Sequence, residues 1–256
     1  MKKSILFSAL ACLASTPATA DTFLGVYAGA QVWGMETDGN FSDNSAFAGD
    51  AQLQDFGFDD ETQGAFYIAF EHFVPFVPNV KVARTTLDTA GNTTLTSSFS
   101  FGGELYTAQS NIITDAEITT TDLILYYELF DNDLVSFDLG IMGNHVDGDF
   151  IVSEAASNTR SEESFSGVIP MLYSRAEFGL PFSGLGVYAE GSYLSLDDNT
   201  VYDYQVAVTY DVIESAALDL TLQAGYRDTT VELDDLDDLN SDLSFSGVFA
   251  GVELHF

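Results

Sequence analysis

The sequence predicts an all-β protein, a transmembrane antiparallel up-and-down β-barrel of about ten strands. Three observations lead to this fold class: an export signal at the start, side chains that alternate between apolar and small or polar along the rest of the chain, and short turns that alternate with longer links. Alternation places one kind of side chain on each face of a strand. A membrane barrel turns its apolar face to lipid and its other face to the lumen.

Residues 1–20 have the features of a secretory signal peptide. Two lysines precede an apolar stretch, and Ala18 and Ala20 form a small-x-small cleavage site. We expect cleavage after Ala20, so that residues 21–256 form the mature outer-membrane β-barrel. Because the only cysteine, Cys12, lies in the signal, we expect no disulfide and no cysteine-ligated metal. Acylation of Cys12 is the alternative, but an alanine stands where a lipoprotein signal usually has a larger aliphatic residue.

The composition combines strong acidity with a high apolar content. The chain has 40 acidic and 7 basic residues, a formal net charge of −33 and a mean hydropathy of +0.11. Acidic chains with few aromatic residues are usually disordered, but this one has 21 Phe and 12 Tyr that need an apolar environment. Nucleic-acid binding requires clustered bases, so we expect no nucleic-acid partner. The bases outside the signal are scattered: Lys81, Arg84, Arg160, Arg175 and Arg227.

Ten segments that are long enough to span the membrane alternate between apolar and small or polar residues. Turn-rich sequences such as FDND (130–133) and PFSG (181–184) separate some of them, and longer links at 35–62, 89–116 and 148–164 separate others. Short turns of such barrels lie on the periplasmic side, so an even number of strands places both termini in the periplasm. The expected strands span about 22–34, 63–74, 79–88, 117–129, 134–147, 165–179, 185–195, 200–212, 217–233 and 243–256.

Eight and twelve strands are the alternatives. The segment 95–109 looks like a further hairpin with Gly102 and Gly103 at its turn. Its arms are shorter than the ~9–11 residues of a spanning strand, so we expect this hairpin outside the membrane. Alternation also falters at Ala83 and Arg84, which suggests a bulge.

A soluble β-sandwich also alternates and is the main competing fold. Its inner face would carry large interdigitating side chains, and its outer face would carry lysines and glutamates. Here the non-apolar face is rich in Gly, Ala, Tyr and Ser with isolated charges, which suits a crowded lumen. Aromatic residues at strand ends also match the girdles of a membrane barrel: Phe23, Phe73, Phe130, Tyr202, Tyr210, Tyr226 and Phe256.

The chain ends with GVFAGVELHF, an alternating strand that closes on Phe256. This ending is similar to the C-terminal signal by which the barrel-assembly machinery recognises outer-membrane barrels. With "LGVYAGAQVW", "YYELFDNDLVSFDLG", "PMLY", "YDYQVAV" and "LDDLDDL", the mature chain resembles a family of small outer-membrane β-barrel proteins of Gram-negative bacteria. The resemblance implies the fold and a location in the bacterial outer membrane. The family has no established activity, so the resemblance implies no catalytic residues.

Charged residues on the non-apolar face are expected to point into the lumen. Because side chains largely fill a barrel of this size, the simplest interpretation is a buried network of mutually satisfied charges. The excess of acids leaves an alternative, a narrow porin-like pathway that favours cations. The candidate lumen-facing charges are Glu128, Asp138, Arg175, Glu177, Glu190, Asp203, Asp219, Arg227 and Glu253, with Glu71 on the same face.

No catalytic, cofactor-binding or metal-binding residues are predicted. His145 lies near Asp147 and Asp149 at the outer end of a strand, where an acid–base pair could work, but no second segment offers an evident nucleophile. The acidic residues of the long links do not match the spacing of a calcium-binding loop. They predict acidic loops that form a solvated rim and meet lipopolysaccharide through bridging divalent ions; unchanged lipopolysaccharide binding after chelation would argue against this.

We therefore expect a monomeric integral outer-membrane barrel with a structural or surface-interaction role, in contact with outer-membrane lipid and lipopolysaccharide. We do not expect an enzyme. A small cation-favouring passive pore is the first alternative, and a lipid-modifying outer-membrane enzyme that depends on His145 is the second. The ligand, the substrate and the physiological role do not follow from these residues.

Overall fold

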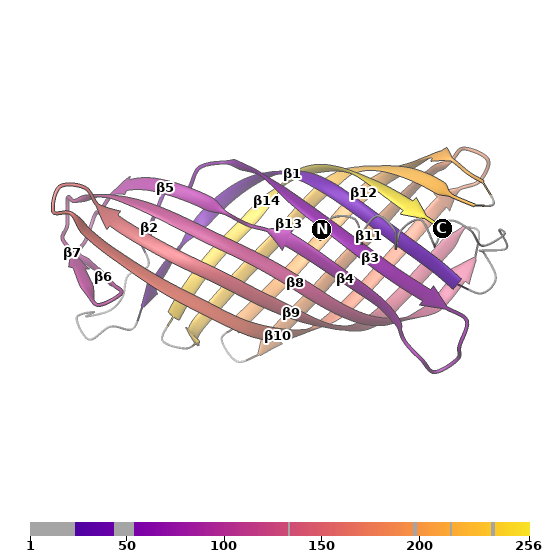
Figure 1. Ribbon diagram of the computed structural model, residues 1–256, viewed down its shortest axis with the longest axis horizontal. Coiled ribbons are helices and arrows are strands. Elements are labelled where there is room, and N and C mark those ends of the chain that lie inside the picture. The colour runs from indigo at the N-terminus through magenta and orange to yellow at the C-terminus, as the bar shows by residue number, and fades with distance from the viewer. Residues whose placement is uncertain (1–23, 44–53, 133, 197–198, 216, 237–238) are drawn as a thin grey trace, which may run out of the picture.

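The computed structural model describes residues 24–43, 54–132, 134–196, 199–215, 217–236 and 239–256 (Figure 1). The predicted signal peptide and the aromatic Phe23 lie outside these residues, as do parts of the predicted acidic loops. In the part of the chain that is described, no helix is long and apolar enough to cross a membrane.

The described residues form strands that run the length of an elongated barrel. Ten of them make the wall, and the short strands β2, β5, β6 and β7 lie near its outer end (Figure 1). The strands are β1 (Leu24–Asp43), β2 (Gln54–Asp55), β3 (Glu61–His72), β4 (Asn79–Thr86), β5 (Thr89–Thr94), β6 (Phe99–Phe101), β7 (Glu104–Tyr106), β8 (Asn111–Asn132), β9 (Val135–Glu154), β10 (Thr159–Leu180), β11 (Leu185–Leu196), β12 (Asn199–Ile213), β13 (Asp219–Leu236) and β14 (Leu239–His255).

The wall is a single antiparallel sheet that closes on itself. Its order is β14-β13-β12-β11-β10-β9-β8-β4-β3-β1, and β1 then pairs with β14. At this seam Trp33 lies opposite Phe249, and the amide N–H of Phe256 donates to the carbonyl oxygen of Val26 at 3.0 Å. Closure leaves no edge in the spanning part of the sheet, as a membrane requires. The predicted ten-stranded up-and-down barrel is confirmed.

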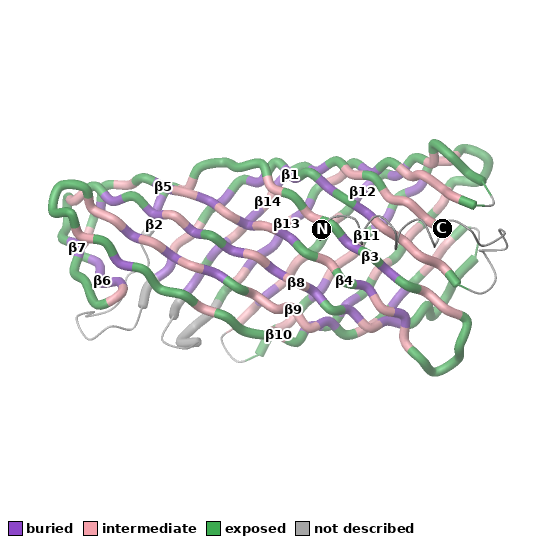
Figure 2. The backbone as a smooth tube through the Cα atoms, viewed as in Figure 1, coloured by how far each residue is buried: buried purple, intermediate pink, exposed green. Residues whose placement is uncertain are grey.

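The outer face of the wall carries exposed apolar side chains. Alternation of exposed and buried residues is visible along each strand in Figure 2. Val32, Ile68, Ile141 and Leu172 are each more than half exposed, at 61%, 58%, 60% and 65%. In water this surface would be unfavourable, so the faces are those of a membrane barrel and not of a soluble sandwich. The predicted girdle residues Phe73, Phe130, Tyr210, Tyr226 and Phe256 are exposed.

The remaining described girdle residue, Tyr202, also lies on the outward face. It pairs in register with Tyr193, which is 53% exposed, and directly opposite residues of a ladder share a face. Tyr202 is itself only partly exposed, and its ring stacks on that of Tyr204.

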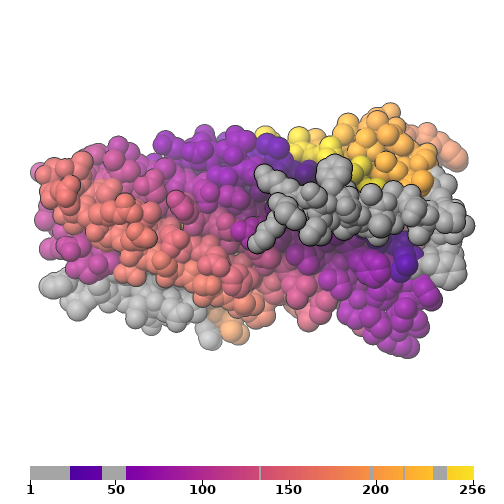
Figure 3. Space-filling view, in the orientation of Figure 1, coloured from indigo at the N-terminus to yellow at the C-terminus, as the bar shows by residue number. Residues whose placement is uncertain are grey.

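Large parts of the segments that were predicted as long links are strands of the barrel wall. β1 continues to Asp43, and β9 and β10 continue to a turn at residues 155–158, so 35–43 and most of 148–164 are paired strand. Continuing the ladder satisfies backbone N–H and C=O groups that a loop would leave to water. Figures 1 and 3 show β8, β9 and β10 projecting at the left end, beyond the gold ribbons of the last strands.

The bulge suggested at Ala83 and Arg84 is wrong. The register of β4 with both β3 and β8 is continuous there, so Lys81 and Ala83 face the lumen while Arg84 faces outward. Alternation faltered in the sequence because Arg84 stands on the outer face, where it donates to the Thr121 hydroxyl at 3.3 Å. Among the described residues, register shifts occur instead near Phe130, Ile213 and Leu236.

The predicted hairpin at 95–109 forms as β6 and β7, with Gly102 and Gly103 at its turn. It is not part of the wall. Its aromatic side chains are buried in a cluster that fills the outer mouth of the barrel, where the ring of Phe41 stacks on Phe56 at 4.3 Å and on Phe150 at 4.4 Å. Tyr106 fixes the hairpin to the wall by donating to the carbonyl oxygen of Val152 in β9 at 2.9 Å. We call this cluster the aromatic plug.

Candidate functional site

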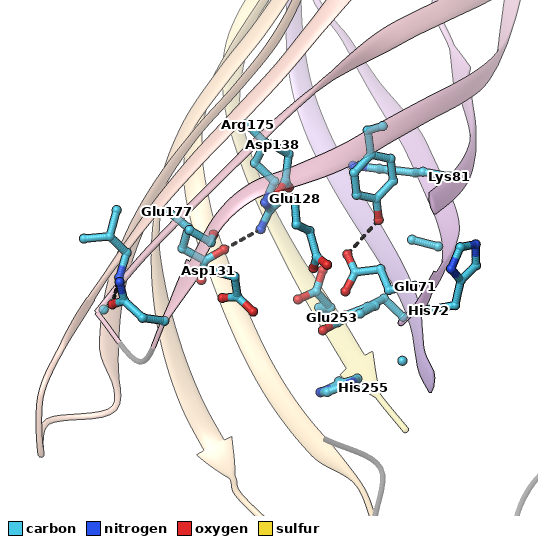
Figure 4. A pocket seen from close by; sticks show the side chains of 18 of the residues that line it. Glu71, His72, Lys81, Glu128, Asp131, Asp138, Arg175, Glu177, Glu253 and His255 are labelled. Atoms are coloured by element: carbon cyan, nitrogen blue, oxygen red, sulfur yellow. Dashed lines mark hydrogen bonds and ion pairs between the residues drawn. The ribbon is translucent and has the colours of Figure 1, made fainter. Parts of the chain in front are cut away.

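In the part of the chain that the structure describes, three spaces follow one another along the lumen. The end nearest the chain termini, which has the short turns and is therefore periplasmic, opens as a vestibule of about 540 Å³ (Figure 4). Its lining includes Glu71, Glu128, Asp138, Glu177, Asp211 and Glu253, with Lys81 and Arg175 as its strong bases. Because acids outnumber bases, the vestibule attracts cations.

An ion-pair layer closes the inner end of the vestibule. Glu190, on β11, is shared by Lys81 from β4 and Arg175 from β10, whose guanidinium lies 2.8 Å from it. The side chains of Lys81 and Glu190 are only 7% and 10% exposed. Arg175 also pairs with Glu177 at 2.8 Å and lies over the ring of Tyr188 at 4.3 Å. Three strands are thereby joined across the lumen.

A glutamine layer lies against these ion pairs. The Gln31 side-chain amide donates to the side-chain oxygens of Gln205 at 3.2 Å and Gln223 at 3.3 Å. The space that remains at this level is about 50 Å³. One water needs roughly 10–15 Å³ of space of this kind, so only a few waters fit at this level. The ion-pair layer and the glutamine layer together form what we call the constriction.

Beyond the constriction lies an outer chamber of about 400 Å³. Arg227 and Asp203 form its floor, where the Arg227 Nε–H donates to Asp203 Oδ1 at 3.0 Å, Nη1 donates to Thr85 at 3.2 Å, and the guanidinium lies over the Trp33 ring at 5.0 Å. Its walls are mainly apolar, and Phe150 and Phe245 connect it to the aromatic plug.

The structure places all but one of the candidate lumen charges against these spaces. Glu128, Asp138, Arg175, Glu177 and Glu253 line the vestibule, Glu190 lies in the constriction, and Asp203 and Arg227 lie between the constriction and the chamber. Asp219 instead lies at the periplasmic rim, 3.6 Å from the His255 ring, with 39% of its side chain exposed.

Several residues that hold the constriction together were not among the sequence candidates. Lys81 was not named as a candidate, although its alternation with Val80 and Val82 already places it on the inward face. Gln31 and Gln223 carry no charge, so they were not among the candidates, which were chosen as charged residues on the non-apolar face. Their meeting depends on β1 and β13 lying on either side of β14, which only closure of the barrel produces.

His145 lies on the outward face of β9, and a serine hydroxyl that the sequence did not reveal lies beside it. Its Nε2 is 3.4 Å from the Ser166 hydroxyl on β10, and its Nδ1 is 3.7 Å from Asp147. His145 pairs in register with Val168, which is 65% exposed on the lipid-facing side. A serine, a histidine and an aspartate therefore lie together at the outer edge of the apolar band. Among the described residues no cluster of His, Cys, Asp and Glu could hold a metal ion.

Comparison with known proteins identifies the fold. The outer membrane protease OmpT from Escherichia coli matches with a TM-score of 0.52 at 10% identity, over 95% of this chain and 99% of that chain. Its likeness covers the closed wall, and the exposed apolar band lies where such a wall meets lipid. The chain is an outer-membrane β-barrel. At this identity the likeness is one of fold alone.

Two further solved barrels match with lower TM-scores. The translocator domain of the autotransporter NalP from Neisseria meningitidis matches with a TM-score of 0.44 and 11% identity, over 99% of this chain and 94% of that chain. The transport unit of the autotransporter AIDA-I from Escherichia coli matches with a TM-score of 0.42 and 6% identity, over 91% and 89%. No protein-family model and no curated protein matches the chain.

Proposed function

We propose that this barrel is a closed scaffold with a structural or surface-interaction role, exercised by the walls that project beyond the membrane. The observation that supports the proposal is the constriction. An ion that crossed it would have to part Glu190 from Lys81 and Arg175 in a space of about 50 Å³. Separating a buried ion pair leaves uncompensated charges and costs about 3 to 5 kcal/mol. The aromatic plug is a second obstacle at the outer mouth.

Recordings in planar lipid bilayers test this proposal. Barrel whose folding has been verified by heat-modifiable gel migration is expected to insert without discrete conductance steps. Reproducible cation-selective steps that shrink in Glu128→Gln, and persist in the exposed control Glu162→Gln, would instead establish the pore alternative, in which the acidic vestibule collects cations.

Ser166 favours a second candidate function, hydrolysis of ester-linked acyl chains at the outer interface. Its hydroxyl would attack the ester carbonyl while His145 Nε2 takes the proton, which then passes to the departing alcohol, and water would release the acyl group by the same route. Asp147 faces the other ring nitrogen and would orient the imidazole. The neighbouring Val168 faces lipid, so an acyl ester of a membrane lipid is the fitting substrate class.

A fluorogenic medium-chain ester in mixed micelles tests this candidate. Hydrolysis is expected to fall at least about a hundredfold in Ser166→Ala and His145→Ala, because general-base catalysis alone supplies that factor. The matched control is Ser164→Ala, two residues away on the same face, where the hydroxyl donates to Asp149. Equal rates in all three variants, or no hydrolysis by the parent protein, would rule the candidate out.

A further inference from the structure

The outer chamber has the properties of a binding site for a small apolar molecule. Its volume of about 400 Å³ lies in the range of roughly 300 to 1,000 Å³ that is usual for ligand pockets. Its apolar lining includes Met142, Phe150, Phe165, Ile169, Leu243 and Phe245, and apolar atoms make up most of the lining surface. A mainly apolar lining is typical of small-molecule sites.

Among the described residues, the wall beside the chamber has a strand edge without a ladder partner. β10 has a ladder partner on both sides only from Leu172 to Phe178; from Thr159 to Met171 its described partner is β9 alone. The gap arises because the β11–β12 hairpin is short and turns between Leu196 and Asn199. Pro170, which has no N–H to donate, stands on this free edge, where proline is tolerated.

The chamber reaches through this gap. Ser164 and Ser166 alternate with Phe165 and Gly167 along β10, so the two pairs point to opposite faces of the strand. Both pairs line the chamber. Gly167 is exposed, and a Cβ added to it would meet nothing within 4 Å. We call the opening between this part of β10 and the β11–β12 hairpin the lateral window.

The lateral window lies at the outer membrane interface. Unpaired strand edges do not face lipid inside the hydrocarbon region, so the free edge of β10 begins where the wall leaves that region. Tyr193, opposite Leu172 at the last paired position, is 53% exposed, and Tyr204 is 43% exposed. Tyrosines of this kind mark the interface of a membrane barrel. A molecule dissolved in the outer leaflet therefore has direct access to the chamber.

The charges around the lateral window argue against an anionic ligand. Glu163 lies on β10 near the opening, and Glu232 and Asp242 lie on the exposed parts of β13 and β14, whereas Glu162 on β10 is paired with Arg160 at 3.0 Å. The one strong base on the chamber floor, Arg227, is already paired with Asp203. An acidic rim repels anions, so the ligand class that fits is uncharged.

One buried hydroxyl in the chamber lacks a partner. Thr229 is 7% exposed and lines the chamber, and its Oγ1 has no hydrogen-bond partner among the described residues. A buried polar group left unpaired is unfavourable, and most such groups in proteins are satisfied. A hydroxyl or ester oxygen on the ligand would satisfy it.

From these observations we infer that the outer chamber binds an uncharged amphiphile with a single alkyl chain, which enters from the outer leaflet through the lateral window. The alkyl chain lies among the apolar side chains, and the polar end bonds to Thr229. The inference does not depend on whether the barrel conducts or hydrolyses esters.

Fluorescence of the single tryptophan tests the inference directly. Trp33 is 1% exposed and packs in the same cluster as Leu243 and Phe245 of the chamber, so a quencher reaches it only from within the lumen. The probe is decanol with bromine at the end of its chain, added to protein in phosphatidylcholine vesicles. We expect saturable quenching. No quenching would overturn the proposal, and so would equal quenching by the anionic bromodecanoate.

Two pairs of matched variants locate the site. Gly167→Phe fills the lateral window and should weaken quenching by about tenfold or more, equivalent to ~1.4 kcal/mol, whereas Gly64→Phe adds the same ring to an equally open position on the outer face of β3. Thr229→Val should weaken quenching by bromodecanol but not quenching by bromodecane. Its control is Thr37→Val, which removes a buried hydroxyl outside the chamber. Quenching of Gly167→Phe at the parent level would overturn entry through the window.

Discussion

Replacing Glu190 with glutamine is expected to destabilise the folded barrel by about 3 to 5 kcal/mol, because removing one partner of a buried ion pair leaves the other charge uncompensated. Glu190 serves both Lys81 and Arg175, and the side chains of Lys81 and Glu190 are almost fully buried. Glutamine keeps the shape and so creates no cavity. The measurement is the free energy of unfolding from a urea titration of the barrel in micelles, followed by Trp33 fluorescence.

The matched control is an exposed pair of the same chemistry. Arg160 and Glu162 lie 3.0 Å apart with side chains 60% and 53% exposed. Exposed ion pairs contribute about 0 to 1 kcal/mol, so Glu162→Gln should change the free energy of unfolding by no more than that. If Glu190→Gln and Glu162→Gln had equally small effects, the constriction would not be the tightly held layer on which the closed-scaffold proposal depends.

The spanning wall could be predicted because each of its strands carries its own signal. Within the membrane one face must be apolar, so alternation marks both the strand and its orientation, as in β8 from Leu123 to Leu129. Beyond the membrane this requirement ends. The outer part of β9 has no continuous apolar outer face, with Asp147 and Asp149 on that side, and the sequence therefore gave no reason to extend the strand to Glu154.

For the site, the sequence predicts only which residues point into the lumen and which point outward. Alternation shows that Glu190 and Arg175 point inward, but which charges meet is decided by strand order and register around the barrel. Lys81 and Glu190 are 109 positions apart in the chain. The same holds on the outer face, where Ser166 reaches His145 because β10 lies beside β9 in one particular register. The inward fold of the hairpin likewise depends on Phe41 and Phe56, which are distant in sequence.

Gly247→Ala is the second substitution with a large expected effect. Gly247 lies in β14 with φ of +153°, a conformation that other residues rarely adopt. A Cβ there would be 1.9 Å from the carbonyl oxygen of Gly34 in β1. That oxygen belongs to backbone held in the ladder of the seam, so it cannot move aside. Backbone strain and overpacking each cost about 1 to 3 kcal/mol, and we expect their sum.

Because the barrel closes only when β14 meets β1, this strain acts on closure itself. The measurement is the fraction of chain that regains heat-modifiable gel migration after refolding into micelles, together with the urea midpoint. Gly64→Ala is the control: Gly64 also lies beside β1, opposite Val32, but its added Cβ meets nothing within 4 Å. Refolding of Gly247→Ala to the level of Gly64→Ala would mean that the seam can widen to admit a methyl group, and that contact between the two backbones is not what holds the barrel closed.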